Sequence, residues 1–100
     1  MKASEVLRST TVQQARLGFK RSDNAYCAVG VLINYLDPTI WVYNEESGIY
    51  NMKDLYYRHD VRTFIEDEWP GLKVDTLISW NDDERLTFQQ IADKLEEQGL

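Results

Sequence analysis

The segment that most constrains the fold is residues 25–36, which is apolar on nearly every side. A helix without a polar face has to lie at the centre of a domain, so we predict a central buried helix here. Residues 22–24 are turn and cap formers and would precede it. Gly30 lies in the middle of this segment and costs a helix about 1 kcal/mol relative to alanine. We therefore expect another element to approach the backbone closely at Gly30.

The size and punctuation of the chain predict one domain over residues 1–100. A chain of 100 residues that is 43% hydrophobic can bury one modest core. Pro38 and Pro70 disfavour helix at the residues before them and divide the chain into thirds, none of which could bury a core of its own. No run approaches the roughly 20 apolar residues of a membrane span, and the first residues lead into no signal segment. We expect a cytoplasmic protein that makes no membrane contact.

Periodicity indicates the elements of the first half. A helix over residues 3–10 is followed by period-two alternation over residues 15–20, which predicts a strand. The alternative continues the helix through a capping box at residues 11–14. Two aromatic runs, residues 40–43 and 49–52, surround a glycine-containing loop and predict a hairpin.

Two further helices are predicted in the second half. Asp60 can cap a helix over residues 61–69, and Pro70 with Gly71 ends it. Thr87 and Gln90 form a capping box for a last helix. The resulting fold class is α+β: a small single domain, mainly helical with about four helices, and with a short antiparallel hairpin or a three-stranded sheet.

The net charge of −6 is unevenly distributed. Five basic side chains against one acidic one give the first 22 residues about +4, so the remainder carries about −10. The simpler interpretation is that a basic N-terminal segment packs across an acidic body, and the alternative is an acidic face offered to a basic partner. Nucleic acid is a poor candidate partner, because phosphate binding needs a clustered basic surface.

The sequence carries no catalytic or metal signature. One cysteine and one histidine cannot supply the four ligands of a structural zinc site. Residues 79–90 can be aligned with a calcium loop but lack its leading carboxylate, its turn glycine and its closing glutamate. Cys27 could act as a nucleophile with His59 as base, yet in an apolar helix it is better explained as a small buried hydrophobe. We predict no enzymatic activity, no cofactor and no metal.

Four motifs follow one another along the chain. They are a Leu-Arg-Ser helix, a Cys-x-x-Gly-x-Leu helix, a Trp-x-Gly-Leu turn, and an Asn-Asp pair followed by Thr-Phe-x-x-Ile-Ala, found here at residues 7–9, 26–32, 68–72, 81–82 and 87–93. This ordered set resembles a family of small, mostly uncharacterised proteins of bacteriophages, prophages and bacteria. The resemblance implies a compact, mainly helical phage-type accessory protein, and it implies no activity. The chain departs from the family in its longer loop before Thr87 and in having Cys27 alone where the family often has several adjacent cysteines.

Aromatic side chains gather in the middle third, and a small hairpin cannot bury both of its faces. Core packing is the alternative for most of these rings, but Tyr and Trp are also favoured at protein interfaces. We predict an interface built from the hairpin aromatics and a solvated acidic loop, with candidate residues Trp41, Tyr43, Tyr50, Tyr56, Tyr57, Trp80, Asn81, Asp82, Asp83 and Glu84. The expected partner is a host protein whose defence or metabolic function is inhibited, and a homodimer is possible as well. The alternative function is binding of a nucleotide-like small molecule in an aromatic-lined pocket.

Overall fold

The computed structural model describes residues 1–100 and confirms the α+β class. The helices are α1 (Ala3–Ser9), α2 (Ala28–Leu36), α3 (Arg58–Glu68), α4 (Val74–Ile78) and α5 (Phe88–Glu97), and a π-helical turn η1 (Ser79–Asp83) continues α4. The strands are β1 (Gln13–Gln14), β2 (Lys20–Ser22), β3 (Ala25–Tyr26), β4 (Trp41–Asn44) and β5 (Ile49–Met52). No helix is long and apolar enough to cross a membrane.

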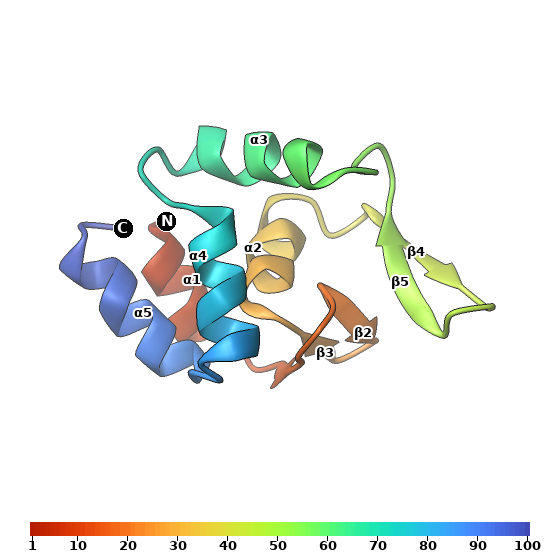
Figure 1. Cartoon of the computed structure of the whole chain (residues 1–100), viewed down its shortest axis with the longest axis horizontal. Coiled ribbons are helices and arrows are strands. Elements are labelled where there is room, and N and C mark those ends of the chain that lie inside the picture. The colour runs from red at the N-terminus through yellow and green to blue at the C-terminus, as the bar shows by residue number, and fades with distance from the viewer.

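The predicted central helix is α2. Figure 1 shows α2 near the middle of the molecule, with α1 and α5 side by side, α3 crossing above, and the β4–β5 hairpin projecting at the opposite end. Ala28, Val29, Leu32 and Ile33 on α2 have no accessible surface. The core therefore lies among the helices, and the hairpin is an appendage to it.

The start of α2 differs from the prediction. The helix begins at Ala28, because residues 25 and 26 form β3, which pairs parallel with β1 and antiparallel with β2. Cys27 occupies the cap position, and its Sγ accepts a hydrogen bond from the Gly30 N–H at 3.4 Å. Sheet hydrogen bonds to β1 and β2 thus override the local helical pattern at residues 25–27.

The prediction for Gly30 is confirmed. A Cβ atom placed on this residue would lie 1.8 Å from the carbonyl oxygen of Phe19. That carbonyl accepts a hydrogen bond from the Cys27 N–H at 3.1 Å. Phe19, directly before β2, is therefore fixed against the first turn of α2. Only glycine allows two backbones to approach this closely.

The predicted strand over residues 15–20 is wrong, and so is the alternative of a continued helix. The chain bends here, Leu17 has a positive φ of 59°, and its side chain is 75% exposed. The Leu17 N–H donates to the Asp82 carboxylate at 3.1 Å. A tertiary contact with η1 therefore fixes a conformation that the alternating pattern does not predict.

The hairpin and the last helix are confirmed. Strands β4 and β5 pair antiparallel, with Trp41 opposite Met52 and Tyr43 opposite Tyr50. Thr87 caps α5: its Oγ1 accepts from the Gln90 N–H at 3.2 Å, while the Gln90 side chain accepts from the Thr87 N–H at 2.9 Å.

The cap of α3 is one feature that needs correction. Tyr57, not Asp60, occupies the cap position of this helix. Asp60 lies in the first turn, and its carboxylate accepts hydrogen bonds from the backbone N–H groups of Tyr56 and Tyr57 at 3.1 and 3.0 Å. Asp60 therefore still accepts hydrogen bonds from backbone N–H groups at the start of α3, but it does so from the first turn of the helix.

Candidate protein-binding surface

One face of the hairpin is turned toward the body of the molecule. Trp41 packs edge-on against Tyr26 with the ring centroids 5.8 Å apart, and its Nε1 donates to the Asn34 side chain at 2.9 Å. On the same face Tyr43 and Tyr50 make a second edge-on pair at 5.2 Å. Trp41 and Tyr50 are half-buried in these contacts. Both side chains mainly attach the hairpin to the body of the molecule, which corrects the prediction that they belong to the interface.

A buried lysine joins the hairpin to the three-stranded sheet. The Nζ of Lys20 lies 4.1, 5.0 and 5.6 Å from the ring centroids of Tyr50, Tyr26 and Trp41. The side chain is 9% exposed and pairs with no carboxylate. We call these four residues the Lys20 cage; its cation is stabilised by the faces of the rings. The Tyr50 hydroxyl donates to Asp23 beside the cage, which raises the pKa of Tyr50.

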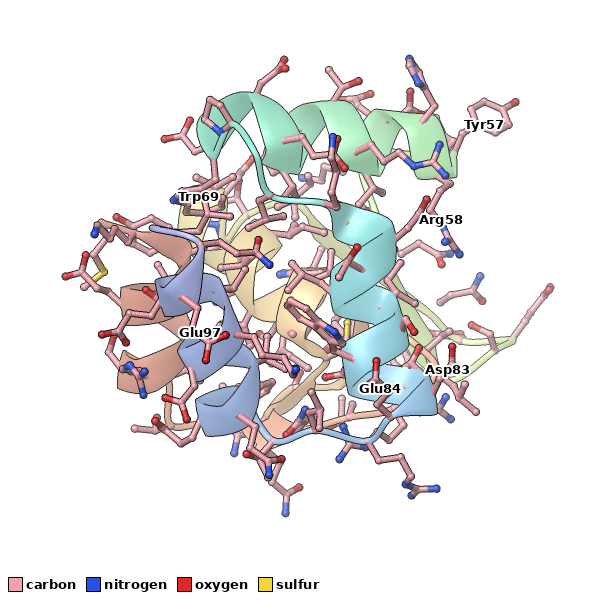
Figure 2. The ribbon with its side chains drawn as sticks, turned by 60° about the vertical axis from the view of Figure 1, so that its left-hand side comes forward. Tyr57, Arg58, Trp69, Asp83, Glu84 and Glu97 are labelled. Carbon is pink, nitrogen blue, oxygen red and sulfur yellow. The ribbon has the colours of Figure 1, made fainter.

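The large side chains that stay exposed at this end are Val42, Tyr43, Tyr56 and Tyr57, at 44, 53, 76 and 74%. We call these four residues the tyrosine surface. Figure 2 shows Tyr57 at the start of α3, pointing away from the body. Single exposed apolar residues are ordinary, but the most exposed rings of the chain all belong to one stretch, residues 42–57. This stretch is the strongest candidate for a binding surface.

The segment from Trp80 to Glu84 is not the solvated loop that the sequence predicted. It forms most of η1, a π-helical continuation of α4. The Trp80 ring is half-buried and lies under the Lys94 ammonium at 5.5 Å. Within this segment only Asp83 and Glu84 are exposed, and Figure 2 shows both at the lower end of this helix, directed outward.

Asn81 has no accessible surface and therefore cannot belong to an interface. Its side-chain oxygen accepts from Gln14 Nε2 at 2.8 Å and from the Ala28 N–H at 3.1 Å. Its amide nitrogen donates to the Ala15 carbonyl and to Asp82 Oδ1, both at 2.8 Å. Every hydrogen-bonding position of this amide is used, so Asn81 joins η1 to β1 and to the start of α2.

The two parts of the predicted interface are not neighbours. The turn η1 packs on α4 and α5, whereas β5 packs on β2. Asp82 is also occupied within the chain, since its carboxylate accepts from Leu17 and Asn81. What remains of the acidic part is the exposed pair Asp83 and Glu84, separate from the tyrosine surface.

The basic N-terminal segment meets the acidic body at one point. Arg8 on α1 binds the carboxylates of Asp93, at 2.6 Å, and Glu96 on α5, which raises the pKa of the Arg8 guanidinium. Arg16 instead donates to the backbone carbonyls of residues 81, 85 and 86, and Lys20 lies among rings. Attraction between basic and acidic side chains thus explains the packing of Arg8, but not that of Arg16 or Lys20.

Cys27 is buried, as predicted, and burial raises the pKa of its thiol to about 12. His59 is exposed on α3. A neutral buried thiol is neither a nucleophile nor a metal ligand at physiological pH. No group of three or more His, Cys, Asp or Glu side chains is arranged to hold a metal ion.

A cavity of about 250 Å³ lies between α1 and α2. Its lining contains two tyrosines and the polar side chains of Ser9, Thr10 and Asn34, but no lysine or arginine; the full set is Met1, Val6, Ser9, Thr10, Val12, Tyr26, Val31, Asn34 and Tyr35. Binding sites for drug-sized ligands occupy about 300 to 1,000 Å³. This cavity suits a fragment smaller than a nucleotide, and it offers no basic side chain to a phosphate.

Comparisons of the chain with protein-family models, with curated proteins and with solved structures gave no match. The candidate surface is therefore defined by the exposure and chemistry of its own residues. Two of these, Tyr56 and Tyr57, stand out because their rings are the most exposed in the chain.

Proposed function

We propose that this protein is a non-enzymatic accessory protein of the phage type that acts by binding a protein of the bacterial host through the tyrosine surface. The observation that supports the proposal is the exposure of Tyr56 and Tyr57, at 76 and 74%, on two successive residues at the start of α3. Exposed tyrosines that are held by a helix start lose little conformational entropy on binding and present both an apolar ring and a hydroxyl.

The type of partner follows from the shape and chemistry of the surface. The exposed rings belong to a projecting hairpin and the turn after it (Figure 1). Tyrosine is enriched among the residues that dominate protein interfaces. The resemblance to phage proteins supplies the host as the source of the partner, and stoichiometric inhibition of a host defence or metabolic function as the expected effect.

Removing the two most exposed rings should remove the partner. We expect a variant with Tyr56→Ser and Tyr57→Ser to retain about one thirtieth or less of the wild-type affinity, since interface hot spots contribute about 2 kcal/mol or more. The measurement is affinity capture from bacterial lysate, followed by titration of the captured protein. Neither side chain makes a packing contact that the fold requires, so thermal unfolding should change little.

The matched control is a variant with Asp83→Ala and Glu84→Ala, two exposed residues in another part of the molecule. It should capture the same partner with unchanged affinity. If the control loses the partner and the tyrosine variant keeps it, the binding surface is η1 and the proposal is wrong.

The alternative function, binding of a nucleotide-like molecule, makes a distinct prediction. A ligand at a hundred times its dissociation constant adds about 2.7 kcal/mol of stability. We expect no member of a nucleotide panel to shift the melting temperature. The cavity between α1 and α2 has no basic side chain in its lining, and the hollow of about 410 Å³ beside the hairpin offers a phosphate only Arg21, next to the carboxylate of Asp23. A reproducible upward shift with any nucleotide would favour the alternative.

A further inference from the structure

The hairpin is a two-stranded sheet, so the outer edges of both β4 and β5 have unpaired backbone groups. The Lys53 N–H donates to the Ile40 carbonyl at 2.9 Å, next to the register that places Val42 opposite Asn51. Hydrogen-bonded and non-bonded pairs alternate in an antiparallel ladder, so the backbone groups of Trp41 and Tyr43 point away from β5. No other backbone or side-chain group of the chain donates to or accepts from them.

The opposite edge of the hairpin, on β5, forms no ladder either, but it lies close to another element. Strand β5 lies against β2, and the Tyr50 hydroxyl binds Asp23 at the end of that neighbouring segment. Figure 1 shows the hairpin projecting beyond the helices with β5 on the side of β2. The edge that is more accessible to a partner is therefore the outer side of β4.

The sequence of β4 does not protect this edge. Proteins commonly block exposed edges with lysine, proline, a bulge or an inward-pointing charge, since an open edge is a template for another chain. Residues 41–44 contain none of these devices and read Trp-Val-Tyr-Asn. Tryptophan, valine and tyrosine also have high strand propensity, and the Val42 and Tyr43 side chains are already exposed on the two faces.

Charge favours a basic partner over a second copy of this chain. Glu45 and Glu46 are exposed directly after β4, and Asp37 precedes it. Hydrogen bonds from Thr39 lower the pKa of Asp37, so its carboxylate stays ionised. Antiparallel pairing of two β4 strands would bring the glutamates of each chain toward Asp37 of the other, and parallel pairing would set the glutamates side by side. Both arrangements place like charges together, and Lys53, the one basic residue near Asp37, compensates only part of this repulsion.

We infer that the outer edge of β4 binds an extended segment of the partner protein as an added strand, and that this segment has β-branched or apolar residues flanked by lysine or arginine. The inference rests on the proposed function and specifies its partner. The N–H and C=O groups of Trp41 and Tyr43 pair with the main chain of the segment. Its side chains lie beside Val42 on one face and Tyr43 on the other, and its basic end lies beside Glu45 and Glu46.

A designed probe tests the main-chain pairing. The probe is the blocked, fluorescently labelled peptide Lys-Val-Thr-Val-Thr-Val-Lys, with binding followed by anisotropy. We expect saturable binding, and a loss of about tenfold or more when alternate peptide nitrogens on the pairing edge are methylated, since each lost hydrogen bond costs about 1 kcal/mol. The same peptide with glutamate ends should also bind about tenfold more weakly. Equal binding of the methylated peptide would overturn the inference.

A pair of variants at Tyr43 tests the edge from the side of the protein. Tyr43→Val removes the ring and keeps the backbone N–H, whereas Tyr43→Pro removes both. Because this N–H points away from β5, proline at this position removes no hydrogen bond of the hairpin. We expect the proline variant to bind the peptide about tenfold more weakly than the valine variant, with near-ultraviolet circular dichroism verifying the fold of both. Equal affinities would overturn the inference.

Two further outcomes separate this inference from the proposed function. If the proline variant still captures the host protein and the Tyr56, Tyr57 variant does not, the protein-binding function stands and strand addition is wrong. Sedimentation equilibrium tests the second copy as occupant. A dimer that the valine variant retains and the proline variant loses would assign the β4 edge to self-association and overturn the inference.

Discussion

Alanine in place of Gly30 is expected to cost about 4 kcal/mol or more of folding free energy, which is a large part of the 5 to 15 kcal/mol that stabilises a typical domain. The added Cβ would lie 1.8 Å from the Phe19 carbonyl oxygen and 2.7 Å from its carbonyl carbon. These are backbone atoms, so no side-chain rotation relieves the overlap. The first turn of α2 would have to move away from Phe19 and break the hydrogen bond from Cys27.

The measurement is urea unfolding, with Gly48→Ala as the matched control. Gly48 has a φ of 73° and nothing within 4 Å of a Cβ position, so alanine there costs only the left-handed backbone penalty of about 1 kcal/mol. The midpoint for Gly30→Ala should fall several times further than that of the control. Similar midpoints for the two variants would mean that the two backbones are further apart than described.

Aspartate in place of Asn81 is the second change with a large expected effect. It preserves shape but sets a second oxygen against the Ala15 carbonyl and Asp82 Oδ1, where the amide now donates two hydrogen bonds. We expect a loss of about 3 to 5 kcal/mol at neutral pH, because the carboxylate would be buried and its second oxygen would face two acceptors, although the first oxygen would keep the donors Gln14 and Ala28. Asn51→Asp, on an exposed strand position, should change stability by no more than about 0.5 kcal/mol.

The loss for Asn81→Asp should depend on pH. Burial and the neighbouring acceptors raise the folded-state pKa of the introduced carboxyl above its unfolded value. Below the unfolded pKa both states are protonated and the charge penalty is absent; it then grows as pH rises toward the folded pKa. Thermal unfolding at about pH 4 and about pH 7 should therefore show a smaller deficit at the lower pH, whereas the deficit of Asn81→Ala should stay constant. A deficit for aspartate that is equal at both pH values would contradict this.

The features that the sequence predicts correctly are those encoded by neighbouring residues. The capping box of α5, the β4–β5 hairpin and the buried α2 all follow from spacing and turn chemistry within a short stretch. The close approach at Gly30 also follows, because glycine inside a buried helix needs a local reason. Such features can be predicted without knowledge of how the helices and strands are connected in space.

The features that the sequence misses depend on distant residues. The sequence predicts Asn81 in a solvated loop, yet Asn81 is buried and forms hydrogen bonds with residues 14, 15 and 28. Ala25 and Tyr26 leave the helical pattern because β1, from an earlier part of the chain, pairs with them in addition to the neighbouring β2. In the candidate site, the exposure of Tyr56 and Tyr57 agrees with the prediction, but the burial of Trp41 and Tyr50 depends on Lys20, which precedes them in another sheet. Pairing of this kind cannot be read from a local pattern.

The Lys20 cage determines how the hairpin responds to ionic strength. Its cation is buried among rings, so dissolved ions screen this contact far less than they screen the exposed ion pairs of Arg8. The hairpin should keep its orientation in concentrated salt while exposed charges lose their effect. A salt series on peptide binding would then report the attraction between Glu45, Glu46 and the basic ends of the bound strand, without a contribution from movement of the hairpin itself.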